Sequence, residues 1–139
     1  MSQWLKSVHS GCGTSFINVI SITQLHAGHA KMAGLVATGA GPAAYLGRIT
    51  IVVDDDIDIH NYDAVDWAVA HRVNAGENDI VIMPATFGMG LDPSTRKRDR
   101  DITMFGTGKW NRVLIDATMN LDYDPDPDFG GARFPPKAW

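Results

Sequence analysis

The stretch RITIVVDDDID, residues 48–58, contains the strongest fold signal of the sequence. Its apolar half is a β-branched run, bounded by Gly47 on one side and by acidic residues on the other. Such a run is typical of a strand that is buried on both faces of a parallel sheet. We therefore expect a central strand here, with a cluster of aspartates at its carboxyl end.

The residues after this stretch predict a helix. Asn61 can cap a helix that begins at Tyr62, where Asp63 favours the exposed N–H groups of the first turn. The side chains that share one side of this helix at helical spacing are Val65, Ala68, Val69 and Arg72. The sequence Asn-Ala-Gly that follows should end the helix near Val73.

A second buried strand is predicted over residues 79–83, with sequence DIVIM, and Pro84 should stop it. Strand, helix and strand over residues 48–83 then form a βαβ unit. This unit predicts a parallel sheet that is covered by helices.

The N-terminal part predicts a hairpin and a helix. Residues 5–8 and 16–22 favour short strands, and the glycines between them suit a turn. Residues 25–37 have a helical composition, which Gly-Ala-Gly-Pro at 39–42 interrupts. We therefore expect a strand hairpin followed by a helix with a break.

Regular signals fade in the C-terminal part. Residues 84–109 suggest a long irregular loop after the second strand of the βαβ unit, and residues 112–115 suggest a last short strand. The predicted fold class is therefore α/β, a three-layer domain over residues 1–118 with a mostly parallel sheet. Residues 119–139 form an Asp/Pro-rich tail that we expect to be irregular.

Composition restricts the partners and the compartment. A chain of 139 residues with 45% hydrophobic content is one ordinary domain. Its net charge of -4 predicts no attraction to nucleic acid or to anionic membranes. Cys12 is the only cysteine, and the sequence contains neither a signal-peptide core nor an apolar run of membrane-spanning length. We expect a cytoplasmic protein.

The acidic cluster allows two interpretations. Asp54, Asp55 and Asp56 follow a strand at the edge where α/β sheets usually place ligands, so they are candidate Mg²⁺ ligands. Alternatively, they cap the following turn and helix. We favour capping, because such metal sites usually need further acids from other strand ends, and none stands out.

Three other features have a functional and a plain interpretation. His26 and His29 are three residues apart and are candidate metal ligands, but a structural or interfacial role is favoured. The basic run at 96–100 can receive an anion, but its interspersed acids favour a solvated, self-paired loop. Phe87, Met89 and Leu91 alternate with glycines on the predicted loop, which fits a pocket wall or a partner contact as well as packing on the core.

Several short motifs together resemble the C-terminal domain of UbiD-family decarboxylases in order and spacing. They are VISI (19–22), AGHA (27–30), IVVDDDID (51–58), WAVAHRV (67–73), LDPS (91–94) and LIDAT (114–118). The resemblance runs from about Val8 to Thr118 and corresponds only to the last part of a family member.

The resemblance implies a reversible decarboxylase of aromatic or α,β-unsaturated acids. Enzymes of this family use prenylated FMN, with a divalent metal and potassium at its phosphate. The cofactor site and a glutamate-arginine-glutamate catalytic set belong to the preceding domain of the family, and Glu77 is the only glutamate here. We therefore assign no catalytic, cofactor-binding or metal-binding residue to this chain.

The resemblance carries over one candidate site. By position relative to Leu91-Asp92-Pro93, residues Phe87, Met89 and Leu91 resemble the segment that contributes apolar side chains to the substrate pocket. The family's C-terminal domain also joins protomers. After Thr118, family members usually continue into a helix that packs on a neighbouring subunit, whereas this chain has the Asp/Pro-rich tail, which puts the usual oligomer in doubt.

Three hypotheses follow. The first is a small non-catalytic subunit of a heteromeric decarboxylase or carboxylase, whose larger UbiD-like partner holds prenylated FMN, the divalent metal and potassium. Because Met1 stands directly before the first predicted strand, we expect a natural subunit, although an engineered truncation would look the same. The alternative is a non-enzymatic, homo-oligomeric binding or regulatory module. The third is a free-standing enzyme that uses the acidic cluster with a metal.

Overall fold

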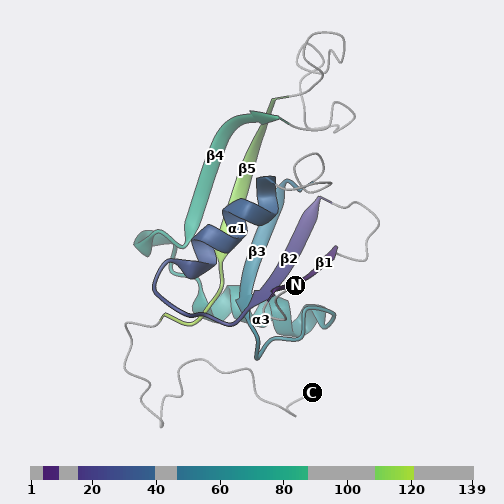
Figure 1. Cartoon of the computed structure of the whole chain (residues 1–139), viewed down its shortest axis with the longest axis vertical. Coiled ribbons are helices and arrows are strands. Elements are labelled where there is room, and N and C mark those ends of the chain that lie inside the picture. The colour runs from purple at the N-terminus through teal and green to yellow at the C-terminus, as the bar shows by residue number, and fades with distance from the viewer. Residues whose placement is uncertain (1–4, 10–15, 40–46, 88–108, 121–139) are drawn as a thin grey trace.

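The computed structural model describes residues 5–9, 16–39, 47–87 and 109–120. In these ranges two helices lie on opposite faces of one sheet, which confirms the predicted α/β class (Figure 1). No helix in these ranges is both long enough and apolar enough to cross a membrane.

The sheet has five strands in the order β1-β2-β3-β5-β4. They are β1 (Leu5–His9), β2 (Ile17–Ile22), β3 (Ile49–Asp54), β4 (Ile80–Phe87) and β5 (Lys109–Asp116). The three central strands are parallel, whereas β1 and β4 are antiparallel edges. The mostly parallel sheet and the N-terminal hairpin of β1 and β2 are therefore confirmed.

The predicted βαβ unit over residues 48–83 is wrong. Strand β4 runs antiparallel to β5 and lies two places from β3, which pairs with β2 and β5. A β-branched run has the same composition whichever way the strand points, so the sequence alone left the direction of β4 undetermined. The true unit is β2, α1 and β3, with α1 spanning His29–Gly39.

Pro84 does not stop β4, which continues to Phe87. The register of β4 against β5 shifts between Met83 and Thr86, and Ala85 has a positive φ of 56°. A proline is tolerated at such an irregularity on an edge strand because no ladder hydrogen bond is required of it there. The last strand, β5, is likewise longer than the predicted 112–115.

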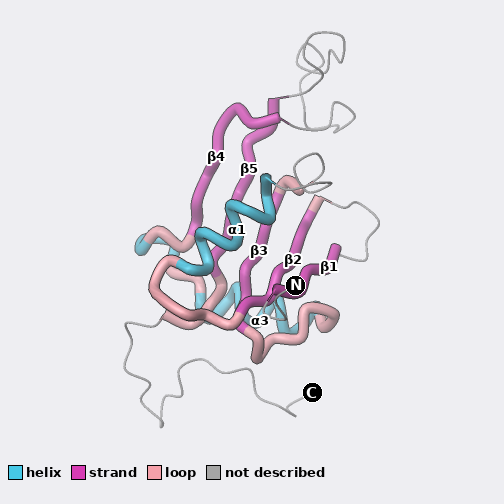
Figure 2. The backbone as a smooth tube through the Cα atoms, viewed as in Figure 1, coloured by secondary structure: helices cyan, strands magenta, loops and turns pink. Residues whose placement is uncertain are grey.

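The two helices cover different parts of the sheet (Figures 1 and 2). Helix α1 begins at His29, four residues later than predicted, because Gly28 with a φ of 78° belongs to the preceding turn. Helix α3 spans Tyr62–Arg72, and the Asn61 side chain accepts a hydrogen bond from the Ala64 N–H, as the sequence predicted. A short 3-10 turn at Ala75–Glu77 leads to β4.

Two apolar clusters, one beneath each helix, make up the core. The cluster on the α3 side consists of Val19, Val53, Ile57, Ile59, Ala64, Val65, Ala68 and Ala117. The cluster on the α1 side consists of Ile20, Ile22, Ala30 and Val52. Residues Val19 to Ile22 are all buried because alternate side chains of β2 point to opposite covered faces.

Candidate functional site

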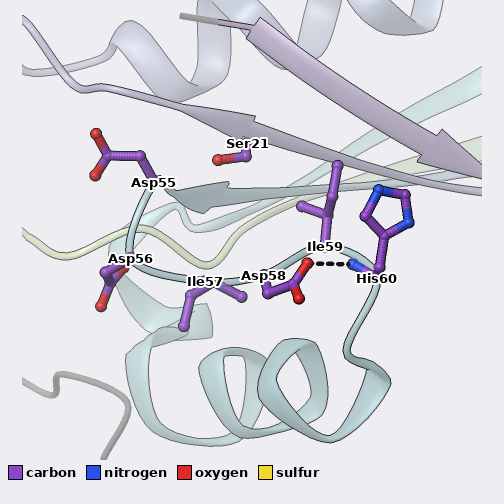
Figure 3. Close-up of a pocket in the computed structure, with 7 residues that line it drawn as sticks. All are labelled: Ser21, Asp55, Asp56, Ile57, Asp58, Ile59 and His60. Carbon is purple, nitrogen blue, oxygen red and sulfur yellow. Dashed lines mark hydrogen bonds between the residues drawn. The ribbon is translucent and has the colours of Figure 1, made fainter. Parts of the chain in front are cut away.

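The carboxyl ends of β2, β3 and β5 meet at one edge of the sheet, and the loop of residues 55–61 leaves this edge for α3. An open depression of about 610 Å³ lies along the loop (Figure 3). It is lined by Ser21, Asp55, Asp56, Ile57, Asp58, Ile59 and His60. Five of these seven are polar or charged, so the depression is a polar surface.

Asp54 is the buried centre of this edge, with a residue exposure of 4%. Gln24 Nε2 donates to its Oδ1 at 2.8 Å, and the Met119 N–H donates to its Oδ2. Burial raises the pKa of the Asp54 carboxyl above its usual value, and these hydrogen bonds together with Arg72 counteract the rise. Through Gln24 and Met119, Asp54 thus fastens the segment between β2 and α1 and the segment after β5 to the end of β3.

Arg72, at the end of α3, binds two acids of the cluster. Its Nη1 lies 3.0 Å from Asp56 Oδ1 and 3.5 Å from Asp54 Oδ2, and its Nη2 donates to Asp56 Oδ2. The Arg72 side chain is 1% exposed, and its guanidinium carbon lies 5.4 Å from the Trp67 ring centre. This two-pronged ion pair fastens α3 to the carboxyl edge of the sheet.

The remaining acids make local contacts. Asp55 accepts a hydrogen bond from the Thr23 hydroxyl at 2.8 Å, and Asp58 accepts one from the His60 N–H at 3.0 Å. The carboxylates of Asp55, Asp56 and Asp58 diverge along the loop (Figure 3). Within the described ranges, no group of three or more His, Cys, Asp or Glu side chains is arranged to hold a metal ion. The Asp58 contact caps the turn, whereas the side-chain bonds described for Asp54, Asp55 and Asp56 go to residues of other segments.

The candidate histidines form a ring stack. His26 lies in the turn before α1, and its ring centre is 4.9 Å from that of His29. The Nδ1 of His29 accepts a hydrogen bond from the Leu25 N–H, and the Nδ1 of His26 bonds with the Ala27 carbonyl. His71 stacks on Trp67 in a similar way. Backbone contacts of this kind orient the rings locally.

A smaller crevice of about 150 Å³ lies beside Asp54, between the start of α1 and the end of β5. Lys31 Nζ lies 3.1 Å from Asp116 Oδ2 and 3.9 Å from Asp79 Oδ1. The Thr118 hydroxyl also donates to Asp116, at 2.6 Å. The polar groups of this crevice therefore bind one another and fix the chain that leaves β5.

The predicted pocket wall lies almost wholly outside the described residues. The backbone of Phe87 ends β4, where it pairs with Lys109. The Phe87 side chain, together with Met89 and Leu91, lies outside what the structure describes.

Sequence reasoning missed Gln24, Lys31 and Met119 because their partners are 30 to 95 residues away. The sequence places Arg72 on the same side of its helix as Val65, Ala68 and Val69, and that spacing was the available signal for its role.

Comparison with known proteins identifies relatives of this domain. The family model for the 3-octaprenyl-4-hydroxybenzoate carboxy-lyase C-terminal domain matches residues 3–117. The anhydromevalonate phosphate decarboxylase of Methanocaldococcus jannaschii is 36% identical over 103 residues, which are 74% of this chain and 22% of that protein. The phenolic acid decarboxylase of Sedimentibacter hydroxybenzoicus is 31% identical over 109 residues, which are 78% of this chain and 21% of that protein.

Solved structures agree with these matches. The UbiD-class enzyme HmfF from Pelotomaculum thermopropionicum, in complex with FMN, has a TM-score of 0.68 at 34% identity, covering 84% of this chain and 23% of that one. The open form of Sedimentibacter hydroxybenzoicus vanillic acid decarboxylase has a TM-score of 0.67 at 30% identity, covering 81% and 22%. This chain spans about a fifth of the length of the curated relatives it matches. Since the family model matches residues 3–117, the chain belongs to the UbiD family, as a representative of its C-terminal domain.

Proposed function

We propose that this chain is the small, non-catalytic subunit of a heteromeric UbiD-like decarboxylase or carboxylase. A larger partner would hold prenylated FMN, its divalent metal and potassium, and the catalytic residues. This chain would shape the substrate pocket and join the assembly. The substrate class is an aromatic or α,β-unsaturated carboxylic acid.

One observation carries the proposal. The family match takes in most of this chain, yet the chain accounts for only about a fifth of the decarboxylases that it resembles. The resemblance implies a catalytic set with two glutamates in another domain, and Glu77 is the only glutamate of this sequence. The remaining parts of such an enzyme would lie outside the 139 residues of this sequence, and a second chain is the source that we propose for them. The names phenolic acid decarboxylase and vanillic acid decarboxylase, both given to similar proteins of Sedimentibacter hydroxybenzoicus, support an aromatic acid as substrate.

The described residues do not fit the cofactor and its metal. A divalent metal at a flavin phosphate needs several oxygen ligands that converge on one point. The acids after β3 diverge, and Asp54 and Asp56 are occupied by Arg72. Lys31, the cation nearest the start of α1, is bound to Asp116. These contacts support a cofactor site on the partner, and no reaction step is assigned to this chain.

The role that we propose for this chain is to hold the residues of the substrate pocket in place. The ion pair of Arg72 and the contacts of Asp54 fasten α3 and the segment after β5 to one edge of the sheet. The segment that begins with Phe87 starts at the opposite end of the sheet, because Phe87 pairs with Lys109, the first residue of β5. Phe87, Met89 and Leu91 on that segment are the proposed wall of the substrate pocket, by the family resemblance stated above.

The proposal is tested by anaerobic purification of the tagged full chain from its native cells. A larger UbiD-like chain with a flavin spectrum should co-purify, and the complex should decarboxylate an aromatic or unsaturated acid. The isolated chain should be colourless and inactive. Recovery of this chain alone, colourless and self-associated at all concentrations, would contradict the proposal and favour the alternative, a homo-oligomeric binding or regulatory module.

A further inference from the structure

The two helices present opposite kinds of surface to the outside. Helix α3 has Asp63, Asp66 and His71 among its exposed residues, as a solvated helix should. Helix α1, with sequence HAKMAGLVATG, contains no acid, and its only formally charged residue is Lys31, which is bound to Asp116. Helix α1 therefore lacks the polar outer face that a surface helix normally has.

The residues of α1 that face outward are apolar. Met32 is 60% exposed, Leu35 50% and Val36 68%, and their spacing places them on one side of the helix. The opposite side, with Ala30, Gly34 and Thr38, is buried on the sheet. In Figure 1 no described element lies over the outer side of α1. Leu25, in the connection just before α1, adds another apolar side chain that is 72% exposed.

A helix that is apolar on both sides is typical of the interior of a larger assembly. Single exposed apolar residues are ordinary, but a whole helix side without a polar residue marks a contact surface. The edge strand β4 also exposes Ile80 and Ile82, whose side chains lie on one face of that strand. This is a smaller apolar surface than the outer side of α1, which exposes Met32, Leu35 and Val36.

The size of this surface argues against a second copy of this chain as its occupant. A stable symmetric interface needs about 20–30 residues on each side. Two copies meeting along α1 would bring together only the ridge of Met32, Leu35 and Val36. A helix that lies in a groove is contacted along its flanks as well, and three anchors at a spacing of three and four residues suit this mode.

We infer that the outer side of α1, formed by Met32, Leu35 and Val36, docks in an apolar groove of the larger flavin-bearing chain. This inference rests on the proposed function for the existence of that chain. It adds which surface makes the contact and what chemistry the partner presents there. Relatives that are about five times longer contain this domain within one chain, so the parts of those proteins outside the domain are candidates for such a groove.

The test compares three tagged full-length variants with the wild type. Val36→Glu and Met32→Lys each place a charge on the outer side of α1. Ile82→Glu is the matched control, since Ile82 is 65% exposed and Val36 is 68% exposed. Each protein is purified anaerobically from native cells, and the co-purifying chain is identified by peptide masses and flavin absorbance. Circular dichroism and thermal unfolding confirm that each variant is folded.

The expected result is that only the substitutions on α1 weaken binding of the flavin-bearing chain. The amount of flavin-bearing chain that co-purifies with a given amount of tagged chain should fall roughly ten-fold or more in Val36→Glu and Met32→Lys. Each variant loses an apolar anchor of the proposed contact and would bury a charge there. Ile82→Glu should retain the wild-type amount. Hydrogen exchange of the wild-type complex should be slower at α1 than in the isolated chain, and unchanged at α3.

Other outcomes separate the two proposals. Equal retention by all four proteins would leave the proposed function standing and overturn the inference about α1. Absence of any flavin-bearing chain, even with the wild type, would contradict the proposed function and remove the named occupant. If the isolated wild type sediments as a dimer that Val36→Glu dissociates and Ile82→Glu does not, the surface belongs to a second copy and the inference is wrong.

Discussion

Arg72 Nη1 lies 3.5 Å from Asp54 Oδ2, and the two side chains are 1% and 5% exposed. Asp54 is the last residue of β3 and Arg72 is the last residue of α3, so this contact joins the ends of two elements that are 18 residues apart in the sequence. The positive guanidinium also sits in the last turn of α3, where the helix dipole favours a cation. The pair therefore holds together the two elements that form the polar edge.

The first prediction concerns Arg72. Arg72→Met should lower the free energy of unfolding by about 3 kcal/mol, because it leaves the buried carboxylate of Asp54 without its cation. Urea denaturation followed by circular dichroism measures the change. Asp55→Asn is the control, because Asp55 is exposed and contacts only Thr23 among the bonds described above. A loss as large in Asp55→Asn would show that charge at this edge in general, not the buried pair, stabilises the fold.

The second prediction is a pH dependence that belongs to Asp54. Its pKa in the folded state is above the usual 3.8, so the folded state binds this proton more tightly than the unfolded state does. The contribution of Asp54 to stability is thus fully present below pH 3.8 and falls as pH rises through the raised pKa. Asp54→Asn lacks this titration. The free energy of unfolding of the wild type minus that of Asp54→Asn should therefore decrease on going upward from pH 3.8.

Denaturation curves at closely spaced pH values test this sign. Asp58→Asn is a suitable control, since Asp58 is exposed. A wild type that gains stability relative to Asp54→Asn over the same range would mean that the hydrogen bonds from Gln24 and Met119 and the charge of Arg72 outweigh burial.

The sequence predicted correctly those features of the fold that depend only on residues close together in the chain. Asn61 as a helix cap and the β-branched run at 49–53 as a central strand were both predictable, because capping and burial on two faces are local requirements. The direction of β4 and the partners of Asp54 were not predictable, because both depend on residues far away in the chain. Gln24 and Met119 reach Asp54 only after three strands have come together.

The third prediction concerns the contact of α1 with the sheet. A β-carbon at Gly34 would overlap the Leu114 side chain and lie 3.1 Å from Val52 Cγ2, and both neighbours are completely buried. Gly34→Ala should therefore lower the free energy of unfolding by about 1–3 kcal/mol, although alanine favours helix. Thermal and urea unfolding measure this loss.

Gly39→Ala is the matched control, because nothing lies within 4 Å of a β-carbon at that position. It should leave stability unchanged or raise it slightly. If Gly34→Ala were as stable as Gly39→Ala, α1 would be able to move away from the sheet without cost, and the close packing would not be a determinant of the fold.

The last prediction concerns a polar side chain in the core. Asn18 is 4% exposed, and within the described residues neither its Nδ2 nor its Oδ1 has a hydrogen-bond partner. Strand alternation places it on the same side of β2 as Ile20 and Ile22, which pack beneath α1. A buried amide without partners costs about 1–3 kcal/mol, so Asn18→Leu, which keeps the branching at Cγ and removes both polar atoms, should raise the free energy of unfolding by about that amount.

Ser21→Ala provides the opposite case on the same strand. Ser21 is also buried, but its hydroxyl donates to the Asp54 carbonyl at 3.3 Å, so its removal should lower stability by about 1 kcal/mol. Opposite signs for the two variants in urea denaturation are the expected result. A loss of stability in both would mean that the Asn18 amide is satisfied in solution, and that the amino end of β2 tolerates a polar group because it is hydrogen-bonded there.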